Sequence, residues 1–276
     1  MRPRAAFKVS GQAVGTERFR EVAVEAATRA GKLLKAERGS RRQVAFKGSP
    51  TNLVTEMDGR AEALIIELLQ AAFPGHGILS EERGSVGPAS SHRWIIDPLD
   101  GTTNYAHGFP VFAVSVALEI NGEVVLGVAY DPNLDECFVA ERGRGAFRNG
   151  DRLRVSETRT LNESLLATGF PYNIRETRDN NLAEYGAFSL SCQGVRRTGS
   201  AVLYLCYVAA GRLDGYWELR LGPWDAAAGA LMVEEAGGRV TDLAGAPLDL
   251  RNPKIAASNG HIHQEMLAVL KEVRAR

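Results

Sequence analysis

The chain has 276 residues, of which 45% are hydrophobic, so it is long enough to bury a large core. Lys and Arg together number 33, Asp and Glu also number 33, and the formal net charge at pH 7 is zero. This balance excludes a general electrostatic attraction to nucleic acid or to anionic membranes, so we expect no direct nucleic-acid binding and no membrane association.

The N-terminal residues 1–15 carry early arginines but no apolar stretch behind them, which favours a flexible tail over a signal peptide. No apolar run elsewhere approaches the roughly 20 residues that cross a bilayer. The three cysteines, Cys137, Cys192 and Cys206, lack the close spacing of a zinc site. We therefore expect reduced thiols in a cytoplasmic protein.

Two helices are expected next in the chain. Apolar residues recur at helical spacing from about Phe19 to Arg38, so this segment should bury one face. A second helix should begin near Thr55 and Asp58, which form a plausible capping pair. Pro74 and Gly75 should end that helix.

The middle of the chain changes to short apolar runs, which predict strands joined by hairpins. Asn121-Gly122 is a strong hairpin turn, and Asn149-Gly150 is a further turn signal. After about Val155 the pattern changes again, and strands alternate with helices.

This order of elements predicts that layers of helix and sheet pack against one another. We expect an α+β / α/β layered sandwich in which residues 16–276 form a single unit. No Pro/Gly/Ser-rich linker divides it. Its halves, about 16–155 and about 156–276, should therefore pack together with the candidate active site between them.

The run Trp94–Asn104, WIIDPLDGTTN, holds two carboxylates three positions apart. An apolar strand should deliver Asp97 at its end, and Pro98 should turn the chain so that Asp100 comes back beside it. Both side chains are ionised at neutral pH and repel each other, so a cation between them would stabilise the pair. Because the donors are oxygens with no His or Cys nearby, the run indicates Mg²⁺ rather than zinc.

The residues directly after this turn can hold an anion beside the cation. Gly101, Thr102 and Thr103 offer backbone N–H groups and hydroxyls, which suit a phosphate. A surface Asx-Pro turn with a helix cap would explain Asp97 or Asp100 alone, but it explains the whole run poorly.

A further acidic position opens a predicted helix in the run Trp224–Gly238. Asp225 lies in its first turn and is followed by Ala-Ala-Ala-Gly, small residues that let the helix approach another element closely. Asp at a helix start is most simply a cap, whereas the functional interpretation directs its carboxylate at the metals. A third and weaker signal is Glu81, which follows the short apolar run Gly77–Ser80.

Together these runs resemble the inositol monophosphatase family, within the lithium-sensitive, metal-dependent sugar and nucleotide phosphatases. The blocks DPLDGTTNYAHGFP and WDAAAGALMVEEAGG carry the resemblance in the family order. It extends from about Phe19 to the C-terminus. The resemblance implies two or three bound Mg²⁺ ions, a homodimer and inhibition by Li⁺.

The resemblance also implies which groups hold the metals: Glu81, Asp97, the backbone carbonyl of Leu99, Asp100 and Asp225. Glu81 and Asp97 would bind the first Mg²⁺ with that carbonyl, and a third, weaker ion would lie near Glu81. The second Mg²⁺ would be shared by the three aspartates. The backbone of Gly101 and Thr102 would hold the phosphate. Thr102 with Glu81 would orient the water, so Glu81, Asp97 and Thr102 are the expected catalytic residues.

Substrate contacts are implied as well. The expected substrate-binding residues are Arg196, Gly199, Ser200, Ala201 and Glu218. Glu218 matches the acid that contacts ring hydroxyls in inositol phosphatases, although an ordinary strand-end acid is the plain alternative. Lys47 and Asp58 match residues of a mobile flap, where a solvated basic loop is the plain alternative for Lys47. Asn52 departs from the Asp that several relatives carry in that region.

The sequence therefore predicts an Mg-dependent hydrolase that uses metal-activated water. No Ser or Cys nucleophile with an adjacent base is apparent. The favoured substrate is myo-inositol monophosphate, because the Thr-Thr-Asn-Tyr-Ala-His continuation and Glu218 match. Fructose-1,6-bisphosphatase, histidinol-phosphate phosphatase and nucleotide 3′- or 2′-phosphatase activities stay open, because such enzymes share the metal site. A binding partner of the transcription machinery is the non-enzymatic alternative.

Overall fold

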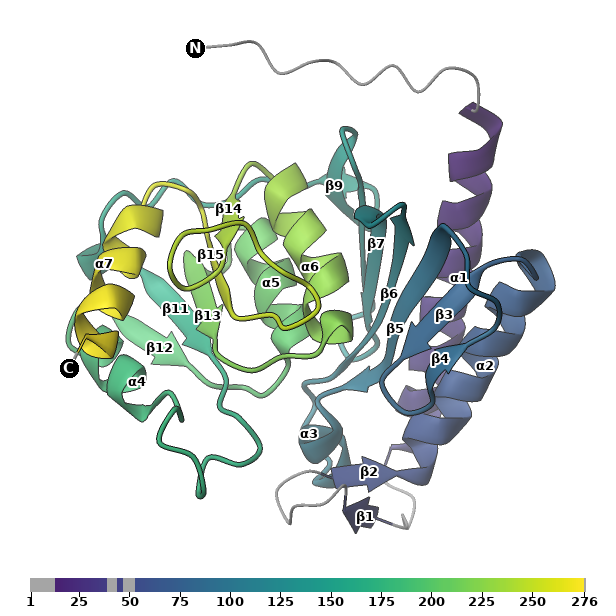
Figure 1. Ribbon diagram of the computed structural model, residues 1–276, viewed down its shortest axis with the longest axis horizontal. Coiled ribbons are helices and arrows are strands. Elements are labelled where there is room, and N and C mark those ends of the chain that lie inside the picture. The colour runs from purple at the N-terminus through teal and green to yellow at the C-terminus, as the bar shows by residue number, and fades with distance from the viewer. Residues whose placement is uncertain (1–12, 39–43, 47–52, 276) are drawn as a thin grey trace.

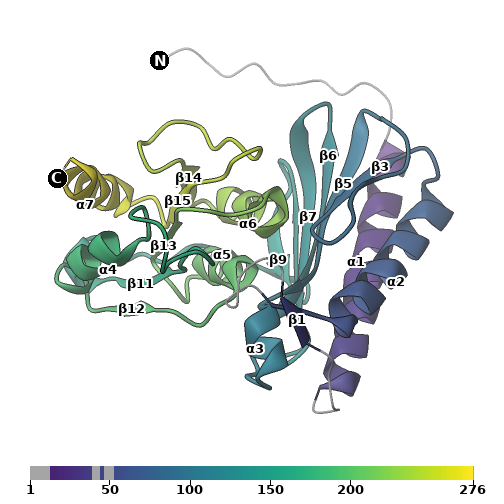
Figure 2. The ribbon, with the colours of Figure 1, turned by 60° about the horizontal axis from the view of Figure 1, so that its bottom comes forward.

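The computed structural model describes residues 13–38, 44–46 and 53–275 (Figure 1). The described chain contains a larger sheet, a smaller sheet and a short ribbon formed by β1 (Val44–Phe46) and β2 (Leu53–Thr55). Helices lie outside and between the two sheets, so helix and sheet alternate in layers (Figures 1 and 2). The expected layered sandwich is confirmed.

The larger sheet has eight strands in the order β10-β9-β8-β7-β6-β5-β3-β4. In chain order these are β3 (Gly77–Ser80), β4 (Gly84–Val86), β5 (His92–Asp100), β6 (Ala113–Ile120), β7 (Glu123–Asp131), β8 (Glu136–Glu141), β9 (Gly145–Arg148) and β10 (Asp151–Arg152). Neighbouring strands are antiparallel, except that β3 and β5 are parallel. Between β6 and β7, φ is 54° at Asn121 and 85° at Gly122, as a type I′ turn requires, so the predicted hairpin is confirmed.

Both faces of the larger sheet are covered by helices (Figure 2). One face packs against α1 (Ala13–Glu37) and α2 (Glu56–Ala72), and the other packs against α5 (Ala201–Ala209) and α6 (Pro223–Glu235). Trp94 and Ile96 on β5 belong to the core under α1 and α2, whereas Ile95 belongs to the core under α5 and α6. This alternation explains why β5 reads as a continuous apolar run, since both of its sides are buried.

Helix α6 approaches the sheet closely because small residues face each other at the contact. A Cβ atom added to Gly127 of β7 would lie 2.8 Å from the carbonyl oxygen of Ala228. On another side of α6, a Cβ atom at Gly229 would lie 2.5 Å from the Leu205 side chain of α5. The predicted close packing of the Ala-Ala-Ala-Gly helix is confirmed, and it fixes the position of Asp225 at the start of α6.

The smaller sheet has five strands in the order β12-β11-β13-β15-β14. The elements of this part are the 3₁₀ helix η1 (Leu161–Glu163), β11 (Leu165–Thr168), α4 (Leu182–Ser189), β12 (Gly194–Arg196), β13 (Gly215–Glu218), β14 (Arg239–Thr241), β15 (Ile255–Ser258) and α7 (His263–Arg274). Helices α4 and α7 cover its outer face, where Phe188, Trp217 and Met266 share a core. Helices α5 and α6 lie between the two sheets, so both sheets contact the same helix pair.

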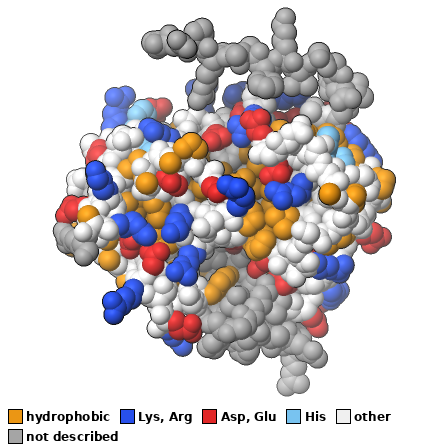
Figure 3. All heavy atoms as spheres, viewed as in Figure 1, with side chains coloured by type: hydrophobic (Ala, Val, Ile, Leu, Met, Phe, Trp, Pro, Cys, Tyr) orange, Lys and Arg blue, Asp and Glu red, His pale blue; other side chains and the backbone are white. Residues whose placement is uncertain are grey.

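Helix α1 begins at Ala13, inside the stretch 1–15 that the sequence predicted to be a tail. Residues 1–12 lie outside the described residues. Basic and acidic side chains are interspersed over the face seen in Figure 3, in line with the balanced composition. Among the described helices, none combines the length and the apolar character needed to span a membrane.

Candidate active site

A β-bulge brings Asp97 and Asp100 to the same side of the larger sheet. Asp97 pairs with Ser115 on β6 and Asp100 pairs with Ala113, so three steps along β5 match two steps along β6. Residues two apart share a face, and the extra residue therefore makes the two aspartates share one as well. The expected end of the strand at Asp97 is wrong, because β5 runs on through Pro98 to Asp100. Pro98 has no N–H group for the ladder, which suits its place in the irregular stretch.

Asp225 meets these two aspartates from α6. One carboxylate oxygen from each of Asp97, Asp100 and Asp225 lies within 4.8 Å of the others. The Asp225 carboxylate also accepts a hydrogen bond from the Gly222 backbone N–H at 2.6 Å, as a capping residue does. Asp225 therefore caps α6 and lies among the other acids at the same time.

The start of α5 binds the Asp100 carboxylate. The Ser200 hydroxyl donates to it at 2.5 Å, and the backbone N–H groups of Val202 and Ala201 donate at 2.8 and 3.3 Å. Ser200 and Ala201, both expected to bind substrate, thus use these groups to hold Asp100. Helix α5 thereby links the two sheets at the acidic cluster.

Burial and mutual repulsion raise the pKa values of all three aspartates. Burial, followed by the charges of Glu81, Asp100 and Asp225, raises the pKa of Asp97 well above its usual value. The pKa of Asp100 rises to about 6, because burial outweighs the hydrogen bonds from α5. Burial, followed by the charges of Asp100 and Glu81, raises the pKa of Asp225 well above its usual value. A cation among the carboxylates would favour their ionised forms, and the oxygen-only donor set suits a hard divalent ion.

Glu81 approaches this cluster from the end of β3. Its backbone N–H donates to the Ile96 carbonyl of β5 at 3.3 Å, and its charge raises the pKa values of the aspartates. Buried Glu62 of α2 holds the same turn, because it accepts from the Ser80 hydroxyl at 2.5 Å and from the Arg83 N–H at 2.9 Å. Sequence reasoning missed Glu62, since an acid on a helix is usually exposed.

Asp58 lies closer to the candidate site than its flap assignment suggested. It is fully buried in the first turn of α2, where its Oδ2 accepts from the Thr55 backbone N–H at 2.8 Å. Its Oδ1 accepts from the Thr102 hydroxyl at 3.1 Å, and the same hydroxyl lies 3.1 Å from the Leu99 carbonyl oxygen. The predicted capping pair is confirmed, and this capping role concealed the second contact. Lys47 and Asn52 lie outside the described residues.

The chain after β5 is held by backbone packing. Gly101 has a φ of 95°, and a Cβ atom there would lie 2.9 Å from the Val111 carbonyl oxygen, so the position requires glycine. Thr102 opens the short helix α3 (Thr102–Ala106). Asn104 of α3 donates to the Thr198 carbonyl at 2.6 Å, which ties α3 to the loop that contains Gly199.

Glu218 lies at the end of β13, 8% exposed. Burial raises its pKa to about 7, and its Oε2 accepts from the Tyr216 hydroxyl at 2.6 Å. The charge of Arg197 acts on Glu218, and the Arg197 guanidinium lies 5.3 Å from the Phe170 ring centroid. Its neighbour Arg196, the residue expected to bind substrate, is an exposed residue of β12.

Sequence reasoning also missed Tyr172, which lies in a turn after β11. Burial raises the pKa of its phenol, and so do the nearby charges, which come from Glu81, Asp225, Asp100 and Asp97. Even so, 52% of the residue is exposed, so it borders the acidic cluster from the solvent side. Its surroundings in sequence form no motif that would have indicated this position.

Comparison with known proteins adds to this geometry. The sequence model described as the inositol monophosphatase family matches residues 16–275. The chain belongs to the inositol monophosphatase family. Its members are metal-dependent phosphatases, so this chain is a phosphoric monoester hydrolase, as the sequence predicted.

Three similar proteins span nearly the whole chain. An inositol-1-monophosphatase of Mesorhizobium japonicum is 48% identical over 259 residues, 92% of this chain and 97% of the relative. The protein named Nus factor SuhB in Escherichia coli (strain K12) is 43% identical, over 91% of this chain and 95% of the relative. The solved inositol monophosphatase of Anabaena (Nostoc) sp. PCC 7120 has a TM-score of 0.86 at 44% identity, over 94% of this chain and 97% of that one.

Proposed function

We propose that this inositol monophosphatase family member hydrolyses a small phosphomonoester, with myo-inositol monophosphate as its preferred substrate. The observation that carries the proposal is the meeting of Asp97, Asp100 and Asp225, from β5 and α6, within 4.8 Å. The name of the Mesorhizobium japonicum relative supports this choice of substrate. The products would be inositol and inorganic phosphate.

Two or three Mg²⁺ ions would be held by Glu81, Asp97, the Leu99 carbonyl, Asp100 and Asp225, of which the three aspartates lie close enough to share an ion. Every donor is an oxygen, and carboxylates so close together, two of them buried, repel one another without a cation. Bound Mg²⁺ would lower the pKa of a water molecule and neutralise charge on the phosphate and on the leaving oxygen.

Thr102 and Asp58 would orient the attacking water. The Thr102 hydroxyl has one hydrogen, and donating it to Asp58 leaves the oxygen lone pairs free to accept a hydrogen bond from the water. Thr55 fixes the Asp58 carboxylate by two hydrogen bonds to Oδ2, and a metal ion on the Leu99 carbonyl, the other acceptor within reach of the Thr102 hydroxyl, would leave Asp58 as its acceptor. Glu81 would accept the other hydrogen of the water from the β3 side.

The substrate would be held at both of its ends. The backbone N–H groups of Gly101 and Thr102 would bind the phosphate, next to the metal ligands of β5. Glu218 would bind ring hydroxyls, and because burial raises its pKa to about 7, near neutral pH part of the enzyme would carry a protonated Glu218 that can donate as well as accept. Gly199, whose N–H donates to the Tyr204 hydroxyl at 2.7 Å, and Arg196 would border the substrate side.

A phosphate-release assay tests the proposal on a panel of inositol 1-phosphate, fructose 1,6-bisphosphate, histidinol phosphate and 3′-phosphoadenosine phosphates with Mg²⁺. We expect the highest kcat/KM on inositol 1-phosphate and none with the Asp100→Asn variant, which should still fold. Turnover of fructose bisphosphate equal to or above that of inositol 1-phosphate would reassign the enzyme within the superfamily. Retained turnover in Asp100→Asn would remove Asp100 from the mechanism.

A second candidate function is binding to the transcription machinery, which the name Nus factor SuhB of the Escherichia coli relative favours. The test is a pull-down of RNA polymerase with wild-type protein and with an Asp225→Asn variant. Equal capture by both would support a role independent of catalysis, and capture by neither would reject it.

The remaining expectations stand as parts of this proposal. Residues 16–276 would act as one phosphatase unit, because Asp97 and Asp100 come from the first half and Asp225 from the second. A homodimer, inhibition by Li⁺ and a cytoplasmic location follow from the resemblance and the composition. Size-exclusion chromatography with light scattering and a Li⁺ titration would test the first two.

A further inference from the structure

Asn181 is a buried asparagine with an uncommon backbone conformation. Its φ is 69°, in the left-handed region, and only 1% of the residue is exposed. It directly precedes α4, yet its side chain makes no cap hydrogen bond to that helix. A left-handed conformation costs a non-glycine residue roughly 1 kcal/mol or more and persists where its surroundings require it.

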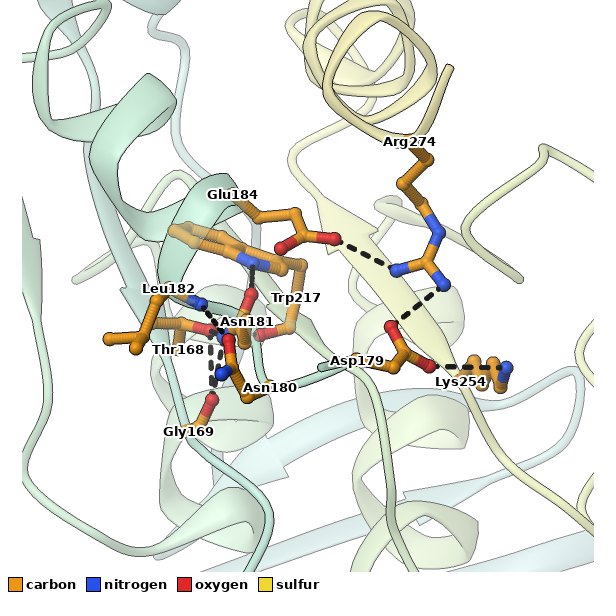
Figure 4. A network of polar contacts seen from close by, with 10 residues as sticks. All are labelled: Thr168, Gly169, Asp179, Asn180, Asn181, Leu182, Glu184, Trp217, Lys254 and Arg274. Atoms are coloured by element: carbon orange, nitrogen blue, oxygen red, sulfur yellow. Dashed lines mark hydrogen bonds and ion pairs between the residues drawn. The ribbon is translucent and has the colours of Figure 1, made fainter. Parts of the chain in front are cut away.

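The Asn181 side chain instead joins the ends of two parallel strands of the smaller sheet (Figure 4). Its Nδ2 donates to the Thr168 hydroxyl and to the Gly169 carbonyl, both at 2.7 Å, at the end of β11. Its Oδ1 accepts from the Trp217 indole N–H at 2.7 Å, on β13. The Thr168 hydroxyl completes the set by donating to the Trp217 carbonyl at 2.6 Å. We call these four residues the Asn181 clamp.

The Asn181 clamp holds both neighbours of the Glu218 carboxylate. Trp217 precedes Glu218 in the chain. Gly169 lies against it in space, since a Cβ atom added there would lie 2.2–2.4 Å from the carboxyl group. The Glu218 carboxyl group therefore packs against Gly169, the residue whose carbonyl accepts a hydrogen bond from Asn181. A shift of the Gly169 peptide would give the carboxyl group room to move.

The segment that carries Asn181 is also anchored from outside (Figure 4). Asp179, two residues earlier, pairs with Arg274 of α7 at 3.0 Å. Arg274 also pairs with Glu184 of α4 at 2.8 Å. These contacts restrain the chain on both sides of Asn181, so the left-handed residue is held in place by α7 as well as by its own hydrogen bonds.

We propose that Asn181 is a positioning residue that holds Glu218 in place for the hydroxyl groups of a polyol phosphate. The inference deepens the proposed function and rests on it. The Asn181 side chain bonds to Thr168, Gly169 and Trp217, none of which is an expected metal ligand, so it should affect how well the polyol is recognised and not how phosphate is cleaved. Misplacing a binding group by about 1 Å can cost one to two orders of magnitude in rate.

The test compares two substrates, inositol 1-phosphate and p-nitrophenyl phosphate, which lacks ring hydroxyls. Asn181→Gly removes the clamp, and glycine accepts the left-handed backbone without strain. We expect its kcat/KM to fall about tenfold on inositol 1-phosphate, mainly through KM, and to stay within about twofold on p-nitrophenyl phosphate. Glu218→Gln should show the same selective loss.

Asn121→Gly is the matched control, because Asn121 also has a positive φ, of 54°, but lies in the β6–β7 turn. Asn121→Gly should leave kcat/KM unchanged on both substrates. Should Asn181→Gly fail to fold, Trp217→Phe removes only the indole donor and should shift the substrate ratio in the same direction.

The inference alone would be overturned if kcat/KM fell equally on both substrates in the clamp variants. It would also be overturned if these variants kept the wild-type ratio of kcat/KM on inositol 1-phosphate to that on p-nitrophenyl phosphate while Glu218→Gln lowered this ratio. A wild-type enzyme without preference for inositol 1-phosphate over p-nitrophenyl phosphate would overturn the proposed function and this inference with it.

Discussion

The Thr102 hydroxyl lies 3.1 Å from the Asp58 carboxylate, which joins residues 44 positions apart at the edge of the acidic cluster. One side of this contact is fixed by α2 and the other by the start of α3. Both residues are shielded from bulk solvent, since Asp58 is fully buried and Thr102 is 5% exposed. The Thr102 hydroxyl can donate its hydrogen to Asp58 or to the Leu99 carbonyl, and in either case its lone pairs stay free to accept a hydrogen bond.

Replacing Thr102 with Val should lower kcat by about 10²–10³ and leave KM nearly unchanged, because the oriented water is lost while phosphate contacts of the backbone remain. Thr102→Ser should restore most of the rate. Steady-state kinetics on inositol 1-phosphate would check this, with Thr160→Val, at an exposed threonine directly before η1, as control. A Thr102→Val enzyme as fast as the control would rule out the relay.

Metal-free stability should depend on pH through Glu218. Burial raises its pKa from 4.5 to about 7 in the folded protein, so the folded state binds this proton more tightly than the unfolded chain. The contribution is fully present below pH 4.5 and is lost as the pH rises through about 7. The shift corresponds to about 3 kcal/mol.

Urea denaturation in EDTA at pH 5 and pH 8 measures this effect. The wild-type free energy of unfolding should fall by up to about 3 kcal/mol more than that of Glu218→Gln over this interval. Titrating groups far from Glu218 are common to both proteins and cancel in the comparison, whereas Asp100 and Asp225 interact with the Glu218 charge and contribute to the difference. Parallel pH dependences would show that Glu218 is not held in its protonated form.

Gly127→Ala should destabilise the fold by about 1–3 kcal/mol, because its Cβ atom would press on the backbone of Ala228 in α6. Gly186 in α4 is the control, since a Cβ atom there meets nothing within 4 Å. Gly186→Ala should stabilise the protein by roughly 0.5–1 kcal/mol through helix propensity. Chemical denaturation would measure both, and equal effects of the two substitutions would contradict the close packing of α6 on β7.

Features encoded within a few residues could be predicted from the sequence. The Asn121-Gly122 hairpin and the Thr55–Asp58 capping box depend on local residue types and spacing, and the short spacing of Asp97 and Asp100 was enough to predict that their carboxylates meet. Helix α6 was predicted with its small residues, and Asp225 with it.

Features that depend on contacts between distant segments could not be predicted. The bulge at Pro98 is visible only once β6 supplies the pairing register, so the sequence suggested a turn there. Asp58 already had a complete local explanation as a capping residue. No motif marks Asn181 in the sequence, because its partner Trp217 is 36 positions away.

The binding of divalent ions by Asp97, Asp100 and Asp225 is most directly tested by thermal unfolding with Mg²⁺ and with EDTA. Ligands that bind only the folded state stabilise it, by about 2.7 kcal/mol at a hundredfold excess over Kd. Millimolar Mg²⁺ should raise the Tm of the wild-type protein and of Asp249→Asn, an exposed acid paired with Arg251, but hardly that of Asp225→Asn. A wild-type Tm that does not respond to Mg²⁺, or an equal rise in the Tm of Asp225→Asn, would contradict the binding of divalent ions by these aspartates.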